Sequence, residues 1–230
     1  MKLYIVATPI GNLKDLTERA REILSSVKLV FAEDTRVAAK LLAHIGAHPR
    51  VIALHHHTVG GALEKVIAEL TSVDEAALVT DAGTPGISDP GNHFIAELIR
   101  RANNSEGHVE HTEIIPIPGP SSVTAALSIC GYPTDRFRVL GFPPHKNKRN
   151  KYFDEVAATE EVTVILESVH RIKKTLADIV RVAPTRHAMV AREMTKLFET
   201  IYRGTASEIS AQILDAETKG EFVIVLSQKI

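Results

Sequence analysis

Small, turn-forming and polar residues follow four of the strands that the sequence predicts in its first half. They form the runs Thr8–Asn12 (TPIGN), Ala32–Arg36 (AEDTR), Asp81–Gly91 (DAGTPGISDPG) and Pro118–Ser122 (PGPSS). Glycine lets a ligand approach the backbone closely, and proline fixes a loop so that little ordering entropy is lost on binding. These residue types predict a site for a small molecule.

The competing interpretation is that Gly and Pro only end the strands, because turns use these residues in most proteins. The run Asp81–Gly91 argues against it, since its eleven residues include two Asp, three Gly and two Pro, more than a tight turn needs. Ligands of open α/β sheets lie beyond the carboxyl ends of the strands. We therefore expect all four loops at one sheet edge.

Two common nucleotide-binding patterns are absent from the sequence. It has neither G-x-G-x-x-G, the dinucleotide fingerprint, nor G-x-x-x-x-G-K-[ST], the phosphate-binding loop. Loops rich in Gly, Pro and small hydroxyl side chains suit an uncharged base and ribose better than a triphosphate.

Short apolar runs alternate with helical patterns in the first half, which predicts βαβ units and a parallel sheet. The predicted strands are Leu3–Ala7, Leu29–Ala32, Val51–Leu54, Ala76–Thr80 and Glu113–Ile117. A first helix carries Leu16, Ala20, Ile23, Leu24 and Val27 at helical spacing, with Asp15 or Thr17 as its N-cap. Further helices are predicted over Val37–Ile45, Ala62–Leu70, Asn92–Ala102 and Ser122–Cys130.

A hinge is predicted over Cys130–Asp135, which contains Gly131 and Pro133. It separates an N-terminal α/β domain (1–131) from a C-terminal one (132–230). Strands of the second domain are predicted over Phe137–Gly141, Val162–Leu166, Ala188–Ala191, Leu197–Arg203 and Phe222–Ser227, and helices over Ile172–Val182 and Ser207–Glu217. The short link between the third and fourth of these strands indicates a mixed sheet with an antiparallel part.

Composition narrows the classes of protein. Of 230 residues, 44% are hydrophobic and 24% charged, as in globular proteins, and the net charge of −1 is too low for a protein that holds nucleic acid by overall charge. The single cysteine, Cys130, excludes an internal disulfide. No apolar run approaches the ~20 residues that span a bilayer, and the N-terminal run is too short for a secretory signal. We expect a cytoplasmic protein with no membrane contact.

Charged residues near strand ends are candidates for catalysis. Glu33, Asp34 and Arg36 could orient a substrate or transfer a proton, or they could complement the dipole at a helix N-terminus. Glu193 and Lys196 follow a predicted strand of the second domain and could act in the same way, or they could form a surface ion pair.

Two further groups could bind a ligand. His55, His56 and His57 are adjacent, so neighbouring side chains point to opposite sides of an extended chain, and no third ligand has useful spacing. We predict no metal there. The basic stretch Lys146, Lys148, Arg149 and Lys151 is either a solvated loop or a set of contacts to RNA phosphates.

Seven motifs in order resemble the tetrapyrrole-methylase superfamily. They are TPIGNL, AEDTR, DAGTPGISDP, PGPSS, GFPP, AREMTK and KGEF, and the resemblance runs from Leu3 to about Leu226. The fold implied is that of class III methyltransferases, with two α/β domains, a parallel sheet in the first and a mixed sheet in the second. The motifs are most similar to the branch that methylates the ribose 2′-hydroxyl of a cytidine in small-subunit (16S) ribosomal RNA.

The resemblance implies S-adenosyl-L-methionine as cofactor, held between the domains, a homodimer, and ribosomal RNA or the small ribosomal subunit as partner. Carried over by position, the cofactor contacts are Pro9, Ile10, Asp81, Ala82, Gly83, Thr84, Ser121, Ser122, Leu166, Ala191 and Glu221. Asn103–Thr112 is longer than the family's usual turn and is predicted to be a surface loop.

Two other functions stay open at this point. A tetrapyrrole C-methyltransferase shares the fold and cofactor but needs a trough for a macrocycle. A nucleotide-binding module without catalysis would bind the cofactor and transfer no methyl group.

Overall fold

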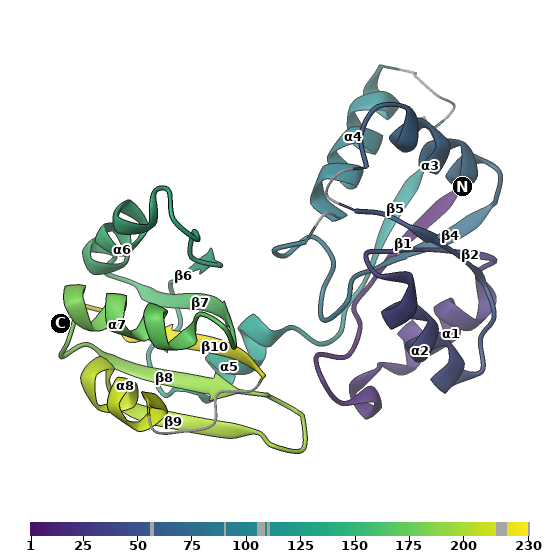
Figure 1. The fold of residues 1–230 in the computed structure, drawn as a ribbon. Helices are drawn as coiled ribbons and strands as arrows, with labels where there is room; N and C mark the ends of the chain where they lie inside the picture. The colour runs from purple at the N-terminus through teal and green to yellow at the C-terminus, as the bar shows by residue number, and fades with distance from the viewer. Residues whose placement is uncertain (56–57, 90, 105–108, 110, 215–219, 230) are drawn as a thin grey trace. The chain divides into compact units, whose positions relative to one another are not determined.

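Buried apolar runs form the strands of two sheets in the computed structural model of this chain (Figure 1). The structure describes residues 1–55, 58–89, 91–104, 109, 111–214 and 220–229. The chain divides into two compact units, Met1–Ser121 and Ser122–Ile230. This division and the predicted one after residue 131 lie at opposite ends of helix α5 (Ser122–Cys130), which is grouped with the second unit.

The first unit holds a parallel sheet with the strand order β3-β2-β4-β1-β5. Its strands are β1 (Lys2–Val6), β2 (Leu29–Ala32), β3 (Arg50–Ala53), β4 (Glu75–Val79) and β5 (Glu113–Ile117). Its helices are the 3-10 turn η1 (Leu13–Asp15), α1 (Glu18–Ser26), α2 (Thr35–Ile45), α3 (Gly61–Thr71) and α4 (Gly91–Asn103). The predicted parallel sheet is confirmed, with each strand within one residue of its expected position.

Helices cover both faces of this sheet (Figure 1). On one face, Leu24 of α1 and Leu42 of α2 pack with alternate strand residues such as Val30. On the other, Ile67 of α3 and Phe94 of α4 pack with the intervening residues. Two-sided burial explains why the strands read as continuous apolar runs.

Helix ends in the first unit follow local capping chemistry. The hydroxyl of Thr17 accepts a hydrogen bond from the Ala20 N–H at 3.2 Å, so Thr17 caps α1, while Asp15 lies in η1. The Asp34 carboxylate accepts from the Arg36 N–H at 2.8 Å and caps α2. Gly46 ends α2 at φ +72°, a conformation that glycine adopts without strain. The two N-caps fix where the polar loops become helix.

The second unit holds a mixed sheet with the strand order β6-β7-β10-β8-β9. Its strands are β6 (Phe137–Gly141), β7 (Val162–Ser168), β8 (His187–Arg192), β9 (Thr200–Thr205) and β10 (Glu221–Leu226). Its remaining helices are α6 (Arg149–Ala158), α7 (Ile172–Val182) and α8 (Ala206–Leu214). Only β6 and β7 pair in parallel, so the predicted mixed sheet is confirmed.

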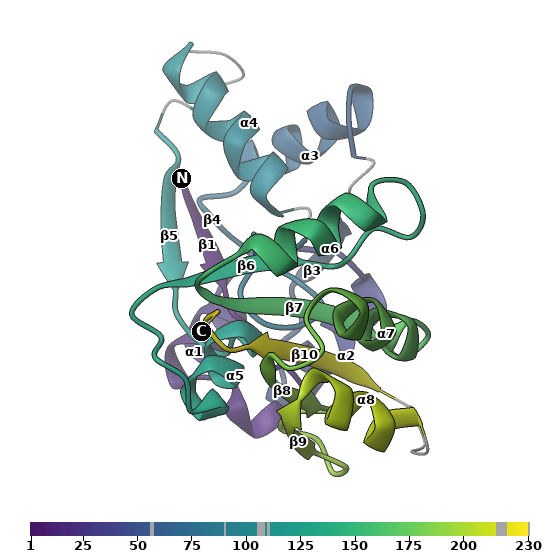
Figure 2. The same ribbon diagram turned by 90° about the vertical axis from the view of Figure 1, so that its left-hand side faces the viewer.

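Figure 2 shows α6, α7 and α8 on one face of this sheet and α5 on the other. The first face buries Phe153 of α6, Leu176 of α7 and Ile209 of α8. Among the described residues, no helix combines the length and apolar composition that crossing a bilayer requires.

Two elements of the second unit, α6 and β9, differ from expectation. Helix α6 was not predicted, because four of the ten residues in its sequence RNKYFDEVAA are charged and it buries few side chains. Strand β9 begins at Thr200, three residues late, since 196–199 form the turn from β8. Helix α8 is described to Leu214, and the rest of its predicted span lies outside the described residues. Residues 105–108 and 110, half of the predicted loop Asn103–Thr112, also lie outside the described residues, and Val109 in this loop is buried.

Candidate cofactor and substrate sites

Four loops of the first unit meet at the carboxyl edge of its sheet, as predicted. The Thr8 N–H donates to the Gly83 carbonyl at 2.9 Å, and the Gly83 N–H donates back to the Thr8 carbonyl at 3.0 Å. The Asp34 N–H donates to the Asp81 carboxylate at 2.9 Å. The Thr84 hydroxyl donates to the Pro120 carbonyl at 3.1 Å. The loop after β4 is thus bonded to the loops after β1, β2 and β5.

Asp89 and Asn92, which the sequence analysis missed, brace the loop after β4 from within. The Asp89 carboxylate accepts from the N–H groups of Gly86 and Gly91 at 2.8 Å, and the Asn92 amide donates to the Gly86 carbonyl at 2.7 Å. An Asp just before Pro-Gly at the start of a helical pattern is a helix N-terminus signal that could have identified it. The brace lets a long loop keep one shape.

Gly83 lies where three of the loops approach most closely. Its φ is +86°, and a Cβ there would lie 3.4 Å from Ile10 Cγ2 and 3.7 Å from the Pro120 carbonyl oxygen. A side chain at this position would therefore be strained and crowded. Of the predicted cofactor contacts up to the start of α5, Asp81 and Ala82 are exposed, Thr84, Ser121 and Ser122 are partly exposed, and Pro9, Ile10 and Gly83 are buried.

Asp34 and Glu33, in the loop after β2, have different roles. Both carboxylate oxygens of Asp34 pair with the Arg36 guanidinium, and the hydrogen bonds from that side chain and from the Arg36 N–H hold the pKa of Asp34 well below its usual range. Asp34 is therefore a helix cap and ion-pair partner, and a weak proton acceptor. The Glu33 carboxylate accepts from the Thr80 hydroxyl at 3.2 Å, which points it at the end of β4.

Two predicted cofactor contacts of the second unit lie side by side. Leu166 of β7 and Ala191 of β8 both pair with Val223 of the central strand β10, on the sheet face away from α6, α7 and α8. Leu166 is 8% exposed and Ala191 1%. They form part of a packed surface, so any contact they make with a ligand is apolar.

Glu193, Lys196 and Glu221 form a charged cluster where β8 ends and β10 begins. The Lys196 ammonium lies 2.8 Å from Glu193 Oε1 and 2.9 Å from Glu221 Oε2. Partial burial lowers the pKa of Lys196, but hydrogen bonds with both carboxylates outweigh it and raise the pKa above the usual 10.5. Lys196 is thus a cation at neutral pH.

The backbone around this cluster is strained. Glu193 and Thr195 have φ values of +51° and +66°. Gly220 has a φ of +111°, and a Cβ there would overlap the Glu193 side chain. Such conformations cost free energy and persist where the surroundings impose them, often at functional sites. The cluster brings together Glu193 and Lys196, which were predicted as catalytic candidates, and Glu221, which was predicted as a cofactor contact.

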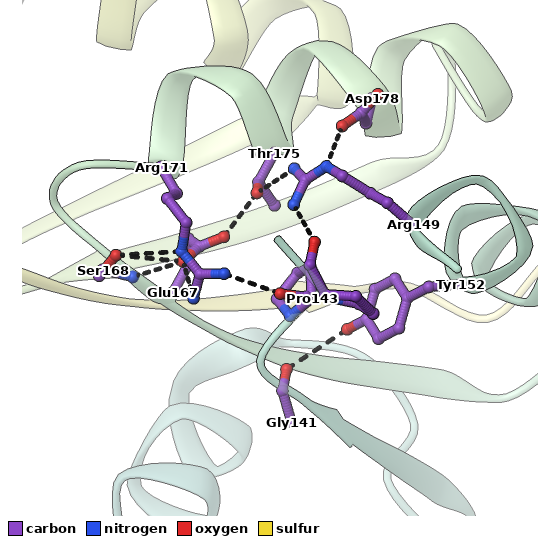
Figure 3. A network of polar contacts seen from close by, with 10 residues as sticks. Gly141, Pro143, Arg149, Tyr152, Glu167, Ser168, Arg171, Thr175 and Asp178 are labelled. Atoms are coloured by element: carbon purple, nitrogen blue, oxygen red, sulfur yellow. Dashed lines mark hydrogen bonds and ion pairs between the residues drawn. The ribbon is translucent and has the colours of Figure 1, made fainter. Parts of the chain in front are cut away.

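The predicted basic stretch separates into two kinds of residue. Lys146, Lys148 and Lys151 are exposed. Arg149 is 6% exposed, and its guanidinium pairs with Asp178 at 2.8 Å (Figure 3). The guanidinium also lies over the Phe153 ring. A buried and fully partnered guanidinium does not meet a phosphate at the surface. Arg149 is therefore removed from the predicted RNA contacts.

His56 and His57 lie outside the described residues, and the His55 N–H donates to the Thr58 hydroxyl at 2.9 Å. Within the described ranges, no three His, Cys, Asp or Glu side chains are grouped so that they could hold a metal ion.

Sequence comparison assigns the chain to a family. The profile of the tetrapyrrole (corrin/porphyrin) methylases matches residues 2–210. The chain belongs to this family. Within it, the chain is 43% identical to the "Ribosomal RNA small subunit methyltransferase I" of Xylella fastidiosa (strain Temecula1), over 97% of its own length and 80% of that protein. It is 41% identical to the protein of the same name in Escherichia coli O157:H7, over 98% of its length and 77% of that protein.

Solved structures of other tetrapyrrole methylases share the fold. A uroporphyrin III C-methyltransferase from Thermus thermophilus superposes with a TM-score of 0.66 at 14% identity, over 99% of this chain and 97% of that one. A structure of uroporphyrin III C-methyltransferase from the same organism, complexed with S-adenosylhomocysteine, gives 0.64 at 15% identity, over 98% and 97% of the two chains. The predicted two-domain α/β fold of this family is confirmed.

Replacing Arg149 and replacing Lys146 should have different effects on the free energy of unfolding. Arg149→Ala leaves Asp178 without its buried partner and should lower the free energy of unfolding by about 3–5 kcal/mol. Lys146→Ala removes an exposed charge and should change it by less than about 0.5 kcal/mol. Urea unfolding followed by circular dichroism measures both. Equal effects of the two substitutions would contradict the division of the stretch.

Proposed function

We propose that this chain transfers a methyl group from S-adenosyl-L-methionine to the ribose 2′-hydroxyl of a cytidine in small-subunit ribosomal RNA. The observation that carries the proposal is the identity of 41–43% to small-subunit ribosomal RNA methyltransferases over nearly the whole chain. The resemblance of the seven motifs to the ribose-methylating branch supports the ribose 2′-hydroxyl of a cytidine as the methylated position.

A tetrapyrrole substrate has weaker support. The uroporphyrin enzymes are 14–18% identical to this chain, a level at which only the fold is shared. One fold carries many functions, so the choice of substrate depends on residues other than those that build the sheets.

The loops of the first unit suit the proposed cofactor. Gly83 and Gly119 let the loops pack closely on one another and keep a fixed shape, because added Cβ atoms would lie 3.4 Å from Ile10 and 3.0 Å from Ala7. The exposed Asp81 carboxylate can accept hydrogen bonds from ribose hydroxyls or an ammonium group. Leu166, Ala191 and Glu221 stay predicted contacts from the second unit. When bound, S-adenosylmethionine supplies a methyl group on a positively charged sulfur.

Residues of the chain must position the ribose hydroxyl and manage its proton. A ribose hydroxyl is a weak nucleophile at neutral pH and gains from a base that takes its proton and a cation that stabilises the forming oxyanion. We assign the cation to Lys196 of the second unit, whose raised pKa keeps it charged, and Glu33 of the first unit stays a predicted candidate for the base. Asp34 and Arg36 neutralise each other, and Glu193 holds Lys196 in place.

Two further properties, the homodimer and the cytoplasmic location, are supported by fewer observations. The homodimer rests on the motif resemblance alone, and sedimentation showing only a 25.1 kDa species at micromolar concentration would refute it. A cytoplasmic location rests on the single cysteine and on a ribosomal substrate.

The proposed substrate is tested by incubating the chain with labelled S-adenosylmethionine and, separately, small ribosomal subunits, free 16S ribosomal RNA and uroporphyrinogen III. Label is expected in RNA, and nuclease digestion should recover it as 2′-O-methylcytidine. Label in the tetrapyrrole alone would select the C-methyltransferase alternative. Cofactor binding by calorimetry with no labelled product would select the non-catalytic one.

The assignment of Lys196 predicts a loss of rate with retained binding. Lys196→Met should lower kcat on ribosomal RNA by roughly 100-fold, as when one donor to a developing oxyanion is lost. Lys196→Arg keeps a cation and should retain much more activity. Because the pKa of Lys196 is raised above 10.5, Lys196 stays protonated below pH 10.5. The kcat of the wild type should therefore show no decrease from deprotonation of Lys196 below that pH. A smaller kcat for Lys196→Arg than for Lys196→Met would exclude the role.

The exposed lysines make a quantitative prediction about salt. If Lys146, Lys148 and Lys151 contact phosphates, changing all three to Gln should flatten the slope of log affinity against log salt by roughly two to three units. Three solvated lysines would leave the slope unchanged. Asp81→Asn should do the converse, weakening S-adenosylmethionine binding in calorimetry while RNA affinity stays the same.

A further inference from the structure

A buried carboxylate in the second unit anchors two arginines. Glu167, at the end of β7, is 1% exposed. Its carboxylate accepts hydrogen bonds from the Thr175 hydroxyl at 2.6 Å and the Ser168 N–H at 2.7 Å, and it pairs with the Arg171 guanidinium at 2.9 Å (Figure 3). The same Thr175 hydroxyl accepts from Arg149 at 2.9 Å. One carboxylate thus orients Arg171 directly and Arg149 through Thr175.

Both guanidiniums reach the loop after β6. Arg171 donates to the Pro143 carbonyl at 2.8 Å, and Arg149 donates to the Pro144 carbonyl at 2.9 Å (Figure 3). Proline has no N–H group, so the carbonyl is its one backbone hydrogen-bonding group. Both consecutive carbonyls are satisfied by charged donors. The Tyr152 hydroxyl adds a hydrogen bond to the Gly141 carbonyl at 3.3 Å.

This arrangement is costly for a loop that contributes little to the core. Burying ionised groups carries a desolvation penalty that good geometry only partly offsets. In the clamped loop, 141–144, Pro143 is buried, whereas Phe142 between two fixed backbone positions is 50% exposed. The network therefore fixes the backbone on both sides of Phe142, whose ring is half exposed, and the exposed Lys146 and Lys148 follow within six positions.

We propose that Phe142 is an RNA-binding residue that stacks on an unpaired base, while Lys146 and Lys148 contact the flanking phosphates. Sequence-specific RNA recognition uses unstacked bases on aromatic side chains beside cations that meet the backbone. Rigid support suits this role, because a backbone that is already fixed loses less entropy when its side chain binds. The inference rests on the proposed RNA substrate and names the residue that reads it.

The neighbouring charges favour RNA over a protein as the occupant of this surface. An exposed Phe could equally enter the apolar pocket of a protein partner, including a second copy of the chain. Two lysines within six positions of the ring, with no acidic residue between them and Phe142, match a polyanion. A protein partner is an outcome that the experiment below distinguishes.

The direct test compares three substitutions of Phe142 in methylation of small ribosomal subunits. Phe142→Ala should raise the KM for the subunit by roughly 10-fold or more, as expected for a lost stacking contact. Phe142→Trp should keep a KM near that of the wild type, whereas Phe142→Leu, apolar but without a π face, should resemble Phe142→Ala. The matched control is Phe137→Ala on β6, since Phe137 is 46% exposed and lies outside the clamped loop. It should leave KM unchanged.

The clamp is tested by combining substitutions. Arg171→Lys keeps a charge near Glu167 but loses the planar fork, and should raise the KM for RNA while the Kd for S-adenosylmethionine stays constant. Combined with Phe142→Ala it should add little, because Arg171 acts as a positioning residue through the ring. Full additivity would show that Arg171 has a separate role and would overturn the clamp.

The outcomes separate this inference from the proposed function. If wild-type chain labels RNA and Phe142→Ala has an unchanged KM, the stacking role is wrong and the function stands. If Phe142→Ala changes only the sedimentation coefficient, the ring contacts another protein chain, which also overturns the inference. If wild-type chain labels no RNA, the proposed function itself fails.

Discussion

The parallel pairing of β1 with both β4 and β5 is the constraint on which the first unit's site depends. Parallel strands end at the same edge, so the pairing delivers the loops after β1, β4 and β5 to one place, where Thr8 and Gly83 exchange backbone hydrogen bonds. In that exchange Gly83 has a φ of +86°, and a Cβ there would lie 3.4 Å from Ile10 Cγ2. The exposed Asp81 then projects from a frame that the backbone exchange and the side-chain hydrogen bonds of Asp89 and Asn92 hold together.

Much of this frame could be predicted from the sequence, because its signals are local. Strands buried on both faces read as apolar runs, and β2, β5, β6, α5 and α7 coincide with their predicted bounds. Thr17 and Asp34 act as N-caps through atoms two or three residues away. The convergence of the loops followed from the parallel topology. Which of Glu33, Asp34 and Arg36 could act chemically did not follow, because mutual neutralisation of Asp34 and Arg36 depends on side-chain geometry.

The second unit shows what local patterns miss. Arg149 looked like its lysine neighbours, yet its partners Thr175 and Asp178 lie 26 and 29 positions along the chain. Only the packing of α6 against α7 brings these residues together. The sequence of α6 itself did not predict a helix. Ion pairs between elements that are distant along the chain produce no periodic pattern in the sequence. The sequence therefore overestimated the charge available for RNA and did not reveal the network around Glu167.

Shared fold and different substrate can coexist in this family because different residues control them. The sheets are built from buried aliphatic positions, which a relative at 14% identity can fill in its own way while keeping a TM-score of 0.66. The loop 141–144 and the lysines beyond it add little to either core, so they are free to change with the substrate. A surface of this kind still needs a fixed geometry to discriminate between ligands. In this chain the buried Glu167 orients Arg171 against the Pro143 carbonyl, so the proposed role of Phe142 couples substrate choice to a residue of the interior.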